Sequence, residues 1–251
     1  MADMAGTPDA LRLEGICKAF GRRRERRPVV DRLSLVVPAG GSVALVGESG
    51  CGKTTTLRVA VGLEPPDEGR VRVGPGGAPQ LVFQDVGASL TPWLTVGELL
   101  EERLRAEGLA ARERRARASE ALGLVGLPPE TVGARPRQLS GGQRQRVALA
   151  RAVAVPPALL ACDEPISALD VSLAAVVLNL LSRLRTELGM ALLFVTHDLA
   201  AARVVADEMA VMLDGRIVEQ GPADRLLTHP DHPHTRRLLG AVPRVPVAEG
   251  V

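Results

Sequence analysis

The segment GESGCGKT, residues Gly47–Thr54, has the glycine spacing, the lysine and the hydroxyl side chain of a loop that binds phosphate groups. It follows the apolar run SVALVG and precedes a segment with helical periodicity, Lys53–Leu63, as this type of loop requires. Glycines allow backbone N–H groups to turn toward phosphate oxygens, and the N-terminus of the following helix adds unpaired donors. We expect Lys53 to reach the β- and γ-phosphates of a nucleotide and the Thr54 hydroxyl to ligate Mg²⁺. The residues of this segment and the one after it that are expected to contact the nucleotide are Gly47, Glu48, Ser49, Gly50, Cys51, Gly52, Lys53, Thr54 and Thr55.

Two adjacent carboxylates, Asp163 and Glu164, follow the apolar run ALLAC. Because that run is expected to be a buried strand, we expect both side chains to emerge at its end, although solvated surface charge is the alternative. A carboxylate at such a position can hold Mg²⁺ through water, and the next can deprotonate an attacking water. A positioned base typically contributes about 10²–10⁴ in rate. We therefore expect Asp163 on the metal side and Glu164 as the general base.

A second glycine pair lies far downstream, in the segment LSGGQ, at the head of a basic helical stretch that begins near Gln143. Ser140, Gly141 and Gly142 would leave free backbone N–H groups at this helix N-terminus, which suits an anion. Serine is also a preferred N-cap residue, so an ordinary helix cap is the alternative for these residues alone. The phosphate loop and the acidic strand end elsewhere in the chain favour the anion-binding interpretation.

Together these motifs resemble those of the ATP-binding subunits of ATP-binding-cassette (ABC) transporters. LSGGQ matches the signature motif of that family, and GESGCGKT and LLACDEP match its two nucleotide motifs, all in family order between about residues 11 and 240. The resemblance implies that Phe20 lies against adenine, that His197 contacts the γ-phosphate and that Gln84 forms the Q-loop. It also implies that Gln84 joins Thr54 and Asp163 at Mg²⁺. The residues that match the signature motif and the D-loop are Leu139, Ser140, Gly141, Gly142 and Gln143, and Ser167, Ala168, Leu169 and Asp170.

The resemblance further implies that ATP hydrolysis needs two cassettes packed head to tail, with the signature motif of one on the γ-phosphate held by the other. ATP would close this pair and hydrolysis would open it, to an extent limited by the differential affinity of ATP for the two states. The expected partners are a second cassette (identical or a paralogue), two transmembrane permease subunits and, indirectly, an extracytoplasmic solute-binding protein. ATP and Mg²⁺ are the expected cofactors, and the cytoplasmic side of the cell membrane is the expected location.

Two longer stretches, QDVGASLTPWLTVGELL and GRIVEQGPADRLLTHPDHPHTRRLLGAVP, resemble ATPases of dipeptide, oligopeptide and nickel importers. They predict uptake of peptides, or of nickel or a metallophore. The short stretch after AVP slightly favours nickel or a metallophore. Val86, Gly87 and His234 depart from the residues usual in that group. One alternative is an ATPase of an exporter or lipid transporter. Another is a non-transport cassette that acts on nucleic acid or ribosomes.

The composition narrows the range of possible functions. The 251 residues carry a formal net charge of +2 and include three Phe, one Trp and no Tyr, so direct nucleic-acid binding is not expected. No apolar run approaches the roughly 20 residues that cross a bilayer, and Met1–Leu11 lacks the apolar region of a signal peptide. Three scattered cysteines favour a reducing compartment. We expect structural roles for His229, His232 and His234, and a solvated loop over Arg22–Arg27.

Strands must hold these side chains at one edge of a sheet. Buried apolar runs at residues 42–47, 158–164 and 191–197 alternate with helical segments, which predicts a mainly parallel sheet covered on both faces. The expected fold is α/β: a P-loop NTPase ABC cassette with a mainly parallel sheet core, an antiparallel β-lobe and an inserted α-helical lobe. We expect a single domain over residues 1–251, with the helical lobe at about 88–140 and a C-terminal tail at about 222–251.

Overall fold

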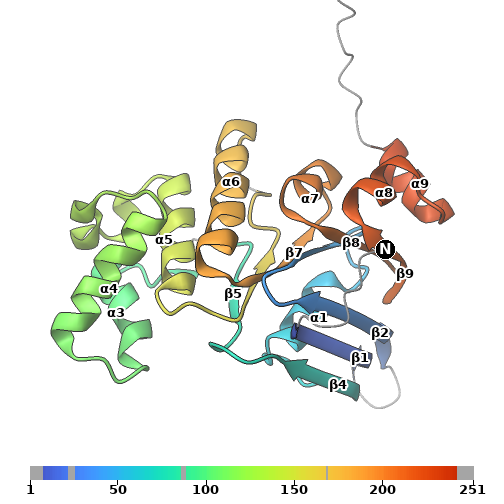
Figure 1. Ribbon diagram of the computed structural model, residues 1–251, viewed down its shortest axis with the longest axis horizontal. Helices are drawn as coiled ribbons and strands as arrows, with labels where there is room; N and C mark the ends of the chain where they lie inside the picture. Colours follow the sequence, from blue (N-terminus) through green and yellow to red (C-terminus); the bar gives the residue numbers. More distant parts are fainter. Residues whose placement is uncertain (1–7, 22–25, 86–88, 168, 242–251) are drawn as a thin grey trace, which may run out of the picture.

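Two sheets form the framework of the computed structural model, which describes residues 8–21, 26–85, 89–167 and 169–241 (Figure 1). The expectations for Arg22–Glu25, Val86, Gly87 and Ala168 therefore fall outside the described residues. The antiparallel sheet has the order β2-β1-β4 and consists of β1 (Asp9–Phe20), β2 (Arg27–Pro38) and β4 (Glu68–Val73). The larger sheet has the order β5-β6-β7-β3-β8-β9 and consists of β3 (Ser42–Val46), β5 (Gln80–Val82), β6 (Leu159–Asp163), β7 (Ala191–Thr196), β8 (Glu208–Leu213) and β9 (Arg216–Pro222).

The larger sheet is parallel except for β9, which pairs antiparallel with β8. Every residue of β3, β6 and β7 is buried, as is typical of parallel strands that are covered on both faces. Side chains alternate between two cores: Leu160 and Phe194 pack on the helical side, whereas Leu159 and Leu193 pack toward the antiparallel sheet. The predicted α/β fold with a mainly parallel sheet and an antiparallel β-lobe is confirmed.

The helices fall into groups that pack on different parts of this framework (Figure 1). Helices α3, α4 and α5 lie together at one end of the molecule, whereas α1 packs against strands of both sheets. Their bounds, with those of the remaining helices, are α1 (Lys53–Ala60), α3 (Val96–Arg105), α4 (Ala111–Leu124), α5 (Gly141–Val153), α6 (Val171–Leu188), α7 (Leu199–Val205), α8 (Ala223–Thr228) and α9 (Pro233–Gly240). Two short 3₁₀ turns, Pro129–Gly133 and Pro136–Gln138, connect α4 to α5.

Side-chain caps set the starts of the helices near the expected site. Ser140 Oγ accepts a hydrogen bond from the Gln143 N–H at 3.2 Å, and Gln143 Oε1 accepts from the Ser140 N–H at 2.8 Å. Helix α5 therefore begins at Gly141, slightly earlier than predicted. Asp170 Oδ1 accepts from the Leu173 N–H at 2.9 Å and so caps α6.

Three features outside the site bear on the earlier expectations. Within residues 8–21, 26–85, 89–167 and 169–241, no helix combines the length and apolar character needed to cross a membrane. Of the basic run near residue 25, Arg26 and Arg27 are exposed; Arg26 pairs with Asp67 at 2.7 Å, and Arg27 is the first residue of β2 rather than part of the loop. His232 Nδ1 accepts from the N–H of His234 at the start of α9, a capping role.

Candidate active site

The loop from β3 to α1 has the backbone shape that its sequence predicts. A Cβ added at Gly47 would lie 2.4 Å from Met212 O, and one at Gly52 would lie 2.4 Å from Val29 O, so neither position has room for a side chain. Gly50 has open space around it but a φ of +81°, a left-handed conformation that favours glycine. Glycine is thus required at Gly47 by packing, at Gly50 by conformation, and at Gly52, whose φ is +108°, by both.

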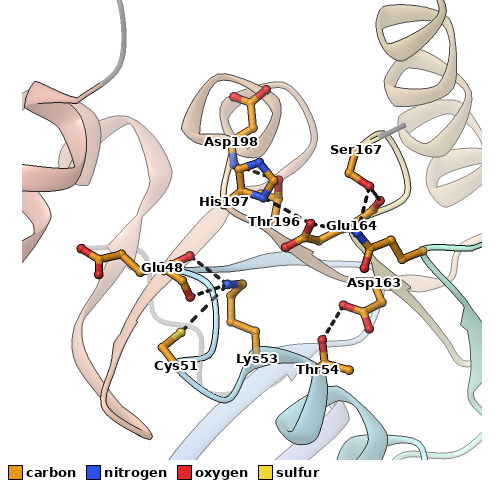
Figure 2. Close-up of polar contacts among 12 residues, drawn as sticks. Glu48, Cys51, Lys53, Thr54, Asp163, Glu164, Ser167, Thr196, His197 and Asp198 are labelled. Carbon is orange, nitrogen blue, oxygen red and sulfur yellow. Dashed lines mark hydrogen bonds and ion pairs between the residues drawn. The ribbon is translucent and has the colours of Figure 1, made fainter. Parts of the chain in front are cut away.

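Lys53 begins α1 and lies inside this loop, with only 5% of the residue exposed. Its Nζ donates to Gly47 O at 2.8 Å and to Glu48 O at 2.9 Å (Figure 2). The ammonium group therefore stands at the centre of the loop. Cys51 is also buried, and its burial raises the pKa of the thiol, which agrees with a small packing residue rather than a reactive one.

Asp163 and Thr54 meet although they lie on different elements. Asp163 ends β6 and is buried, and its Oδ1 accepts from the Thr54 hydroxyl at 3.1 Å (Figure 2). Burial raises the pKa of the Asp163 carboxyl above its ordinary value, and the bond from Thr54 opposes that shift. This pair of oxygen donors, one a buried carboxylate, fits a Mg²⁺ ion, which prefers oxygen ligands.

Glu164 is the centre of a second polar group. Its φ of +44° is rare for a residue other than glycine, and its N–H donates to Val195 O of β7 at 2.9 Å. Its Oε2 lies 3.2 Å from His197 Nδ1 and 3.5 Å from Gln84 Nε2. Figure 2 shows Glu164 and His197 facing one another above Asp163. Because β6, β7 and β3 are parallel neighbours, their carboxyl ends bring these groups to one edge of the sheet.

Ser167 makes hydrogen bonds to two residues of this group, Glu164 and Gln84. Its hydroxyl donates to Glu164 O at 3.1 Å and accepts from Gln84 Nε2 at 3.3 Å. The sequence places Ser167 in the D-loop motif but does not predict this contact. Gln84 and the Thr54–Asp163 pair line a cavity of about 430 Å³, whose other lining residues are Arg58, Phe83, Asp85 and Ser89.

Arg58 also lines this cavity and was not predicted from the sequence. It lies four residues after Thr54, so the helical period predicted for that segment places both side chains on one face. This four-residue spacing is the sequence feature from which the position of Arg58 beside Thr54 could be predicted.

The signature segment lies apart from the phosphate loop of the same chain. Its helix α5 packs against α3, α4, α6 and β5, whereas α1 packs against β1, β2, β6 and β7 (Figure 1). A Cβ at Gly142 would lie 2.6 Å from Leu173 Cδ1, but one at Gly141 would meet nothing within 4 Å. Leu139 is buried, whereas Ser140 and Gly141 are exposed. A side chain at the second glycine would therefore displace Leu173, whereas the first glycine has no structural reason within the described chain.

The remaining predicted residues occupy varied surroundings. Phe20, at the end of β1, is 44% exposed and its ring lies 5.3 Å from Lys18 Nζ. Ser49 is exposed and Thr55 is half-buried. Leu169 packs against the helical-side core.

Comparisons with known proteins agree with this geometry. The family described as ABC transporter matches residues 30–167. The oligopeptide transport ATP-binding protein OppD of Mycobacterium tuberculosis is 44% identical over 229 residues, which cover 86% of this chain and 37% of OppD. The chain thus spans little more than a third of that relative. A putative peptide import ATP-binding protein of Brucella ovis is 40% identical over 255 residues, which cover 96% of this chain and 80% of that protein.

A solved structure gives the same result. The ATP-binding cassette MJ0796, in a dimeric post-hydrolysis state bound to ADP and Pi, matches with a TM-score of 0.74 and 29% identity. The match covers 85% of this chain and 98% of that cassette. The family resemblance seen in the sequence is confirmed: the chain belongs to the ABC transporter family.

Proposed function

We propose that the chain is the ATP-hydrolysing subunit of an ABC importer that takes up peptides. The observation that carries the proposal is the meeting of Lys53, Thr54, Asp163, Glu164 and His197 at the carboxyl ends of β3, β6 and β7. This set combines a cation in a backbone cradle, two oxygen donors for a metal and a carboxylate beside an imidazole. Enzymes that transfer a phosphoryl group to water use groups of these kinds.

Each residue has a role in that reaction. Lys53 binds the phosphate groups of ATP, and Phe20 lies against the adenine. Glu164 accepts a proton from the attacking water, whose oxygen bonds to the γ-phosphorus as the bond to the β-phosphate oxygen breaks, giving ADP and phosphate. His197 and Gln84 orient that water. Thr54, Asp163 and Gln84 would hold Mg²⁺, which when bound neutralises negative charge on the phosphates.

The signature segment provides the reason for a second cassette. Ser140 and Gly141 are exposed at the start of α5, and α5 does not belong to the group of elements that surround α1. A facing cassette would bring its own Ser140–Gln143 segment to the γ-phosphate held here. The dimeric form of the similar cassette MJ0796 supports this arrangement.

The similar proteins also guide the choice of substrate. OppD is named for oligopeptide transport and the Brucella protein for putative peptide import. These names support peptides over nickel or a metallophore, and an importer over an exporter or a non-transport ATPase. The proposed partners are the second cassette and two permease subunits, with this chain at the cytoplasmic face of the membrane and a solute-binding protein on the other side.

Glu164→Gln tests the assignment of the base. A carboxamide keeps the size of the side chain but is a poor base, so we expect a loss of about 10²–10⁴ in kcat with ATP binding retained. ATP hydrolysis by the purified chain, equilibrium ATP binding and the proportion of dimer in the presence of ATP are the measurements. Glu187→Gln, a change in an exposed carboxylate at the far end of α6, is the matched control. Hydrolysis at the parental rate in Glu164→Gln would show that another group is the base.

A further inference from the structure

Helix α9, which contributes no residue to the proposed catalytic group, is fixed near the phosphate loop. Leu238 and Leu239 pack against a core that includes Val46, the last residue of the strand leading into that loop. The turn before the helix is held by Glu219 of β9, whose carboxylate accepts from the Asp231 N–H at 2.8 Å and from the next N–H at 3.2 Å. The position of α9 is therefore set by the same sheet that positions the loop.

Arg237 connects this helix to the loop. Its Nη2 lies 3.5 Å from Glu48 Oε1 and 2.9 Å from His234 Nδ1. His234 is only 4% exposed, and because a guanidinium group can only donate, its Nδ1 is the acceptor in this contact. A buried ring thus holds the guanidinium group where it can meet the carboxylate of Glu48.

Glu48 is the acidic residue of the phosphate-binding segment. Its carbonyl oxygen accepts from Lys53 Nζ, but its side chain extends away from Lys53 (Figure 2). The charge of Lys53 is therefore directed at the loop carbonyls, and Arg237 is the cation that the structure pairs with the Glu48 carboxylate. An unpaired carboxylate within a Debye length of about 10 Å would repel a polyphosphate.

We propose that Arg237 is a positioning residue for nucleotide binding: it holds the Glu48 side chain away from the cradle and offsets its charge. This inference rests on the proposed ATPase function. It makes α9 part of the apparatus that sets ATP affinity. Both side chains are more than half exposed, at 69% for Arg237 and 57% for Glu48, so the effect is that of an exposed ion pair. Such a pair corresponds to a change of about two- to five-fold in affinity.

A double-mutant cycle on the full chain tests the proposal. Equilibrium binding of a fluorescent ATP analogue with Mg²⁺ is measured for the parent, Arg237→Ala, Glu48→Gln and the double variant at about 50 mM salt. We expect Arg237→Ala to weaken binding about two- to five-fold, with kcat within about two-fold of the parent. In the Glu48→Gln background the same change should have no effect, because no charge is left to offset. At about 0.5 M salt the loss should disappear.

Arg236→Ala is the matched control, because its guanidinium group donates to Pro230 O and Asp231 O on the same helix-turn unit and not to the loop. Three results would overturn the inference: parental affinity in Arg237→Ala, an equal loss in the Glu48→Gln background, or an equal loss in Arg236→Ala. A parent chain that does not bind the nucleotide at all would instead overturn the proposed function.

Discussion

The two glycines of the signature segment should respond differently to alanine. Gly141 is exposed at the first position of α5, and a Cβ there would meet nothing within 4 Å. Gly142 is buried, and a Cβ there would lie 2.6 Å and 2.9 Å from the two methyl groups of Leu173. The same substitution therefore tests function at one position and packing at the next.

The structure gives the magnitudes. Glycine in a helix costs up to about 0.5–1 kcal/mol relative to alanine, so Gly141→Ala should leave stability unchanged or raise Tm by about 1–3 °C. Gly142→Ala overpacks the contact with α6 and should cost about 1–3 kcal/mol, nearer the lower value because the methyl groups of Leu173 can rotate away. That cost corresponds to a fall in Tm of several degrees in a chain of this length.

Gly141→Ala should lower ATP hydrolysis even though it leaves stability unchanged or raises it. If the N–H groups at the start of α5 approach the γ-phosphate held by a facing cassette, a methyl group at Gly141 obstructs that approach. We expect ATP hydrolysis to fall at least about ten-fold, equivalent to about 1.4 kcal/mol in the barrier.

Thermal denaturation and steady-state ATP hydrolysis, measured on the same preparations, are the assays. Parental hydrolysis by a well-folded Gly141→Ala chain would refute the role assigned to the signature segment. An unchanged Tm in Gly142→Ala would refute the packing argument. The double variant Gly142→Ala/Leu173→Ala checks the cause, because removing the methyl groups should abolish the added cost of the alanine.

Two further predictions concern the phosphate loop and the metal carboxylate. Gly47→Ala should lower Tm and abolish nucleotide binding, because the nearest atom to its Cβ is the backbone oxygen of Met212. Gly50→Ala, in open space, should cost only about 1 kcal/mol of stability because of its positive φ. Thermal denaturation and ATP binding measure both effects. Asp163→Asn should abolish Mg²⁺-dependent hydrolysis yet raise stability at neutral pH. Burial raises the pKa of that carboxyl above its ordinary 3.8, so the parent chain loses stability as pH rises from about 3.8 to the raised pKa, because the carboxyl ionises first in the unfolded state. The gain should vanish below about pH 3.8, and denaturation curves that show an equal gain there would contradict this account.

Local features of the site could be predicted from the sequence because they depend on neighbours only a few residues away. The glycine loop before α1, the Ser140 cap of α5 and the burial of the strand before Asp163 each follow from short segments. Boundaries were less accurate. The helix predicted over Lys53–Leu63 ends at Ala60, because Gly62 takes a φ of +78°.

The family resemblance extended those predictions to residues with no local signal of their own. A single histidine after a strand or a glutamine near a loop has no distinct chemistry in the sequence. His197 and Gln84 were assigned through motif order, and the structure brings both within 3.5 Å of Glu164.

What the sequence alone determined were the loop, the buried strands and the motif set, since backbone conformation and hydrophobic period are encoded locally. The tertiary structure alone decided which side chains meet: Thr54 with Asp163, Gly142 with Leu173, and Glu48 with Arg237. Such contacts depend on strand order and on how the helices pack on the sheet. Residues far apart in the chain reach one another only after the parallel strands have aligned their carboxyl ends.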